Sequence, residues 1–151
     1  MSLENWLQSG YLLNHQATVA EVQKLLGLVD RELSDAAVQG LSADGRFMHA
    51  YDAAFQLCAI ALHASGYEVG KGKGHHAYTI NSLEHTLGPQ QAANTMYLSK
   101  CSTQRHHSLY DHAGVVSEQD AQDLLDTARQ LMVEVLNWLR VHHSSLVPHG
   151  R

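Results

Sequence analysis

The residues best suited to chemistry lie in the stretch Arg105–His112. In a helix Arg105 and His112 are two turns apart, so both project from one face, which Cys101 and Ser108 share. An arginine that holds a phosphate group beside a histidine that moves a proton is a minimal set for cutting RNA. The alternative interpretation is the solvated end of a helix in a small bundle.

The positive charge of the chain is concentrated in its middle third. The whole chain has a formal net charge of −5, which argues against a general nucleic-acid coat protein. Residues 69–110, however, have a net charge of +3, because they carry Lys71, Lys73, Lys100 and Arg105 against one acidic residue. We therefore expect any site for RNA or a nucleotide here, with the three lysines as contacts. The alternative is a short, solvated basic loop.

Two other kinds of phosphate chemistry fit the sequence poorly. The glycine- and lysine-rich stretch Gly70–Gly74 lacks the spacing, the Ser or Thr after lysine and the preceding strand of a P-loop. A di-metal bundle needs Glu-x-x-His pairs, and no acidic residue here has a histidine three positions later. The sequence predicts no metal and no cofactor, although His75–His76 and His106–His107 could capture a metal ion adventitiously.

The two cysteines and the N-terminal residues indicate the cellular compartment of the protein. Cys58 and Cys101 fall within expected helices, where packing is their expected role. Two thiols without a recognisable secretion signal indicate a reducing compartment. The chain has no run of about 18 apolar residues that would form a membrane span. We therefore expect a cytoplasmic protein.

The hydrophobic pattern predicts an all-α protein. Apolar residues recur at helical spacing between glycine and proline boundaries, and no strand pattern of useful length is found. The expected elements are short helices over 1–13 and 76–87 and longer helices over 19–39, 43–65, 89–112 and 117–141. These helices predict an up-and-down antiparallel bundle of four to five helices, with the helix at 43–65 in its centre. The single domain would span 1–141, and 142–151 would be a disordered tail.

The last expected helix has more apolar surface than one bundle is expected to bury. Beside its core stripe it carries a second seam of Leu125, Met132, Leu136 and Leu139. An exposed apolar seam of that size marks an interface. The sequence therefore predicts a symmetric homodimer.

The Arg105 stretch resembles the signature of the HEPN superfamily (higher eukaryote and prokaryote nucleotide-binding domain), as found in its small prokaryotic members. Those domains carry an arginine, a polar residue and, after four to six positions, a histidine; here these are Arg105, His106 and His112. The resemblance extends from about residue 17 to 138 and includes the runs Leu41–Phe47 and Tyr51–Ala54. It implies a helical bundle, a homodimer with the two motifs face to face and, in many members, a metal-independent endoribonuclease.

The resemblance also implies partners and residue roles. Many of these domains are toxins neutralised by an antitoxin, often a minimal nucleotidyltransferase. We expect a toxin or stress-module protein in which Arg105 holds phosphate, His112 transfers a proton and His106 orients the site. Tyr110 takes the position that follows a four-residue gap, so the functional pair is either Arg105 with His112 or Arg105 with Tyr110. The alternative function is a non-catalytic bundle that binds a nucleotide or a protein partner.

Overall fold

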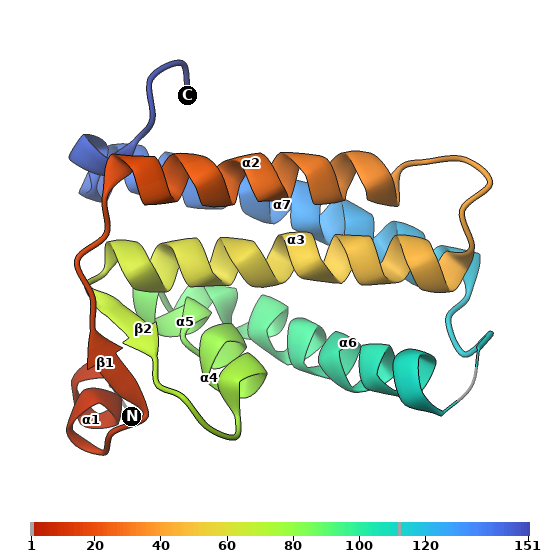
Figure 1. Cartoon of the computed structure of the whole chain (residues 1–151), viewed down its shortest axis with the longest axis horizontal. Coiled ribbons are helices and arrows are strands. Elements are labelled where there is room, and N and C mark those ends of the chain that lie inside the picture. Colours follow the sequence, from red (N-terminus) through yellow and green to blue (C-terminus); the bar gives the residue numbers. More distant parts are fainter. Residues whose placement is uncertain (1, 112) are drawn as a thin grey trace.

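The computed structural model describes residues 2–111 and 113–151 and is an all-α bundle, as the sequence predicts. Four long helices dominate it (Figure 1). Their bounds are α2 (Val19–Ala36), α3 (Ala43–Ala64), α6 (Ala92–Tyr110) and α7 (Glu118–His142). The short elements are α1 (Leu3–Gln8), β1 (Leu12–Asn14), β2 (Tyr67–Val69), α4 (His75–Asn81), α5 (Leu83–Thr86) and 3₁₀ turns at Pro89–Gln91 and Ser144–Leu146.

Helix α3 is the centre of the bundle, as its pattern predicts. It packs against α2 and α7 on one side and against α4, α5 and α6 on the other (Figure 1). Side chains around most of its circumference are buried, among them Phe47, Tyr51, Leu57 and Ile60. Because α3 has so little solvated surface, the polar side chains it carries lie mostly against other helices.

Side-chain caps fix where three of the long helices begin. Thr18 accepts a hydrogen bond from the Glu21 amide, and Ser42 accepts one from the Gly45 amide. Ser117 and Asp120 form a reciprocal capping box at the start of α7. These are the helix starts that the sequence predicts.

The prediction of no strands, with a helix over residues 1–13, is wrong. Helix α1 ends at Gln8, and Gly10 follows with a φ of +83°, a conformation that favours glycine. The chain then forms β1, which pairs antiparallel with β2 in the register Leu12 with Val69 and Asn14 with Tyr67. Leu12 is buried with Trp6 and Leu62, so this pairing and its small apolar cluster decide the conformation.

The C-terminal segment also differs from the disordered tail that the sequence predicts. Leu146 and Val147 pack against the core. Arg151 forms an ion pair with Asp30 of α2, and its carbonyl accepts hydrogen bonds from Arg140. Contacts between distant parts of the chain order this segment, and local sequence pattern does not reveal them.

The apolar seam of α7 is not left exposed by the single bundle. Leu125 and Leu139 are fully buried, Met132 nearly so, and Leu136 packs against the core. The expectation of an exposed seam is therefore wrong, and the seam no longer supports the prediction of a homodimer. None of the helices in the described residues combines the length and apolarity needed to cross a membrane.

Two substitutions on α7 test this packing. Leu131 is fully buried, so Leu131→Ala should lower the free energy of unfolding by about 2–5 kcal/mol. Val133 lies two residues away and is half-exposed, so Val133→Ala should change it by less than about 0.5 kcal/mol. Urea unfolding followed by circular dichroism measures both. Equal losses from the two variants would contradict the orientation of α7.

Candidate functional site

Helix α6 presents one face to α3, and this is the face that carries Arg105. Cys101 is buried on it, and Ser108 donates a hydrogen bond of 2.8 Å to Asp44 Oδ1 in the first turn of α3. Asp44 Oδ2 also accepts from the Gly114 amide at 2.9 Å. The Asp44 carboxylate thus fixes the end of α6 and the following turn against α3, and Arg105 is held one turn before that anchor.

The Arg105 guanidinium lies over the ring of Tyr51 and beside Asp52, both from the middle of α3. Its central carbon is 5.3 Å from the Tyr51 ring centroid, a cation–π distance. Arg105 Nε is 3.8 Å from Asp52 Oδ1, an ion pair too long for a hydrogen bond. Nε is buried and has no hydrogen-bond partner among the described residues. The Arg105 side chain as a whole is still 27% exposed, so an acceptor from outside can approach this donor, which has no hydrogen bond.

His76, in the first turn of α4, lies beside the rings of Tyr51 and Phe55. Its Nδ1 is 2.8 Å from the Tyr51 hydroxyl, and its ring packs on Phe55 with centroids 4.3 Å apart. Burial lowers the pKa of His76, and the charges of Arg105 and His75 lower it further. Burial raises the pKa of Tyr51 to about 12. At neutral pH the pair is therefore a neutral imidazole beside a protonated phenol.

These groups open into a pocket of about 320 Å³ between α2, α3, α4 and α6. Its lining consists of two arginines, two carboxylates, an imidazole and apolar or amide groups: Arg31, Arg105, Glu32, Asp52, His76, Leu28, Phe55 and Gln56.

The pKa values of the two carboxylates in this pocket, Glu32 and Asp52, are shifted in opposite directions. Burial raises the pKa of Glu32, but hydrogen bonds from His49 and Arg31 outweigh it, and the net pKa is lowered. Burial raises the pKa of Asp52, and the opposing charge of Arg105 does not cancel the effect. The carboxylate beside Arg105 is thus the one more easily protonated.

Two of the other residues singled out in the Arg105 stretch lie outside this pocket. His106 and Tyr110 are on the exposed side of α6 with ring centroids 4.8 Å apart, and Tyr110 is 72% exposed. His112 lies outside the described residues. Among the described residues, the structure brings the imidazole of His76 to the pocket of Arg105.

The three lysines are likewise dispersed. Lys71 and Lys73 are exposed in the loop between β2 and α4. Lys100 lines a different hollow, of about 700 Å³, with His107, Gln104 and Asp120 between α6 and the start of α7. None of the three lysines lines the Arg105 pocket.

Tyr51, Asp52 and His76 were not identified as site residues from the sequence. Tyr51 and Asp52 belong to the run that carries the family resemblance, and this is the only sequence signal that could have directed attention to them. His76 is paired with Arg105 only by the packing of α4 against α6.

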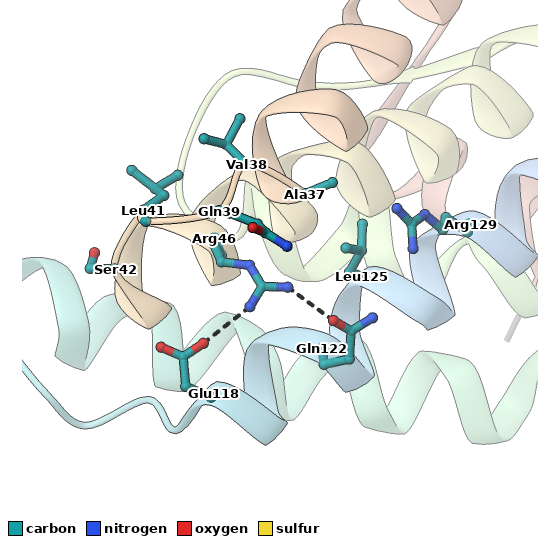
Figure 2. A pocket seen from close by; sticks show the side chains of 11 residues that line it. Ala37, Val38, Gln39, Leu41, Ser42, Arg46, Glu118, Gln122, Leu125 and Arg129 are labelled. Carbon is teal, nitrogen blue, oxygen red and sulfur yellow. Dashed lines mark hydrogen bonds and ion pairs between the residues drawn. The ribbon is translucent and has the colours of Figure 1, made fainter.

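A third hollow, of about 650 Å³, lies at the end of the bundle, between the α2–α3 loop and α7 (Figure 2). Its central group is Arg46, whose guanidinium donates to the Ala36 carbonyl, Glu118 Oε2 and Gln122 Oε1 at 2.9–3.0 Å. Each of its nitrogens is thereby satisfied from within the chain. Arg46 joins α2, α3 and α7, and it has less capacity than Arg105 to bind an external anion.

The cysteines are not candidates for nucleophilic catalysis. Both are free and buried. Burial raises the pKa of Cys58 to about 12 and that of Cys101 to about 11, so both remain thiols at neutral pH.

Comparison with known proteins found no similar protein. The chain matches no family model, no curated protein and no solved structure.

The titration of His76 tests the geometry of the pocket. Its pKa should lie below the ordinary value of about 6.5 in two-dimensional NMR of the imidazole resonances. Arg105→Gln removes a positive charge that lowers this pKa, so the variant should raise it. Arg129→Gln, on the exposed face of α7, is the matched control and should leave it unchanged. An identical His76 pKa in the Arg105 variant would contradict the pocket.

Proposed function

We propose that the protein binds the phosphate groups of RNA or a nucleotide in the Arg105 pocket and cuts RNA there without a metal ion. The observation that carries the proposal is that Nε of Arg105 is buried and makes no hydrogen bond with any described residue. A phosphate oxygen is a strong acceptor, and the planar guanidinium can bind two such oxygens at once. The resemblance of the Arg105 stretch to HEPN domains supports the same activity.

The surroundings of Arg105 favour a phosphate ester over a simple carboxylate. Arg31 also lines the pocket, paired with Glu32 through a hydrogen bond of 2.9 Å. Phe55 and His76 present ring surfaces on which a nucleobase could stack. The neighbouring Asp52 has a raised pKa, so its negative charge is the one most readily neutralised when an anion enters.

His76 supplies a proton acceptor for the cleavage reaction. In this proposal its Nδ1–H donates to the Tyr51 oxygen, so that Nε2 can take the proton from a ribose 2′-hydroxyl. The O2′–phosphorus bond then forms, and Arg105 stabilises the charge on the phosphorane. The phosphorus–O5′ bond breaks and the leaving oxygen takes a proton, for which His112 is the donor expected from the motif. The products are a 2′,3′-cyclic phosphate and a 5′-hydroxyl.

The resemblance adds expectations about assembly and setting. A homodimer and a nucleotidyltransferase-type antitoxin are both part of this proposal. The binding-only function is the alternative outcome of the experiments below.

Binding is tested by fluorescence anisotropy with a labelled single-stranded RNA at several salt concentrations. Arg105→Gln should weaken binding about tenfold or more, because it removes a charge-assisted contact to phosphate. Arg129→Gln should bind like the unmodified protein. If the loop lysines contact phosphate, Lys71→Ala with Lys73→Ala should reduce the slope of log affinity against log salt. RNA and nucleotide binding that is independent of salt and of Arg105 would contradict the proposal.

Cleavage is tested with the same RNA in the presence of EDTA. The protein should leave 2′,3′-cyclic phosphate ends, and Arg105→Ala and His76→Gln should each reduce the rate about 10²-fold or more. His112→Gln and Tyr110→Phe compare the two candidate motif positions. Binding without cleavage would establish the non-catalytic alternative, and activity that requires an added metal ion would overturn the metal-free mechanism.

A further inference from the structure

A second cluster of chemical groups lies at the other end of α3, far from Arg105 in the chain. It consists of His15 just after β1, Glu21 in the first turn of α2, His63 in the last turn of α3 and Glu68 in β2. The antiparallel pairing of β1 with β2 brings these four segments together beside the start of α2 (Figure 1). No spacing in the sequence predicts this cluster, because its members come from four separate elements.

The ligand atoms of two histidines and one carboxylate converge. His15 Nε2 lies 2.5 Å and 2.8 Å from the two Glu21 oxygens. His63 Nδ1 lies 3.3 Å from Glu21 Oε2. One ligand atom from each of these residues lies within 4.8 Å of the other two.

Glu68 orients the ring of His15. His15 Nδ1 lies 2.8 Å from Glu68 Oε2. With the Nδ1 proton donated to Glu68, a metal ion could take the place of the proton between Nε2 and the Glu21 carboxylate. Histidines that ligate a metal characteristically donate their second ring nitrogen to a carboxylate in this way.

His63 Nδ1 is the second candidate nitrogen ligand, and its contact with Glu21 is an ion-pair contact of 3.3 Å. This nitrogen is buried and makes no hydrogen bond of normal geometry with any described residue. A buried ring nitrogen that makes no hydrogen bond is costly unless something binds it.

We infer that His15 Nε2, His63 Nδ1 and the Glu21 carboxylate form a binding site for a divalent transition metal ion, with Zn²⁺ as its preferred occupant, and that Glu68 positions His15. Two imidazoles and one carboxylate are a common zinc donor set, with a water as the fourth ligand. Mg²⁺ and Ca²⁺ prefer sites made of oxygen alone.

The distances fit such an ion after a small adjustment. Ligand atoms about 2.0–2.1 Å from a tetrahedral zinc are about 3.3 Å from each other, which is the separation of His63 Nδ1 from Glu21 Oε2. The contact between His15 and Glu21 is shorter and would open by less than 1 Å through rotation of the exposed part of the carboxylate. The bound ion would tie β1 and β2 to the ends of α2 and α3.

A second group of possible metal ligands, Glu32, Asp35 and His49, can be compared with this site. It has a single imidazole, and Arg31 already neutralises Glu32 through a hydrogen bond of 2.9 Å. His49→Gln therefore serves as a matched control, and His107→Gln controls for adventitious capture on the surface.

Isothermal titration of metal-free protein with ZnCl₂ tests the site. The expected result is one ion per chain, with affinity reduced at least 10²-fold by His15→Gln or His63→Gln and by about 10–100-fold by Glu68→Gln. His49→Gln and His107→Gln should keep the affinity of the unmodified protein. Circular dichroism of each metal-free variant identifies loss of folding, and Glu68→Gln, which removes no ligand, keeps the test valid if a ligand variant unfolds.

Substitution with Co²⁺ gives an independent readout. A site with two nitrogen ligands and tetrahedral geometry should produce visible absorption bands that are absent in His15→Gln and unchanged in His49→Gln. The inference is overturned if the unmodified protein binds no Zn²⁺, or if zinc affinity is lost in His107→Gln or His49→Gln and kept in His15→Gln. These outcomes are independent of RNA binding, so the inference and the proposed function fail separately.

Discussion

The burial of α3 is the constraint on which the rest of the structure depends. A helix that is surrounded by other elements can carry polar groups only where a neighbour or a ligand satisfies them. Asp44 is satisfied by α6 and the turn after it, and Arg46 by α2 and α7. Tyr51 and Asp52 meet Arg105, and His63 meets Glu21. Polar side chains of this one helix thus take part in both proposed sites and in the Arg46 hydrogen bonds.

The degree to which these polar groups are satisfied separates structural from functional positions. The Arg46 guanidinium uses all its nitrogens in hydrogen bonds within the chain, whereas Arg105 Nε is left without one. The same distinction holds for the histidines. His15 bonds both its ring nitrogens to carboxylates, whereas His63 Nδ1 makes no hydrogen bond with a described residue and only an ion-pair contact of 3.3 Å with Glu21. A buried donor or acceptor without a hydrogen bond lowers the stability of the fold. Such an atom therefore marks a position where binding of an external group is favourable.

The two sites lie at different positions along α3 and use different chemistry. The Arg105 pocket combines cations with aromatic rings, and we propose it for phosphate. The His15–His63 cluster combines imidazoles with carboxylates, and we propose it for a metal ion. The first depends on the packing of α4 and α6 against α3, and the second depends on the small sheet.

Hydrophobic periodicity and local caps determined the helical class, the central place of α3 and the starts of the long helices. Helical spacing also placed Cys101, Arg105 and Ser108 on one face, which is the face that packs on α3. These are properties of a few neighbouring residues, and local energetics fix them. Only the tertiary structure decided which groups meet. The pairing of Leu12–Asn14 with Tyr67–Val69, the burial of the α7 seam, the approach of His76 to Arg105 and the cluster around His63 all join residues distant in the chain. Such contacts form because the whole chain packs at once, and no local spacing encodes them.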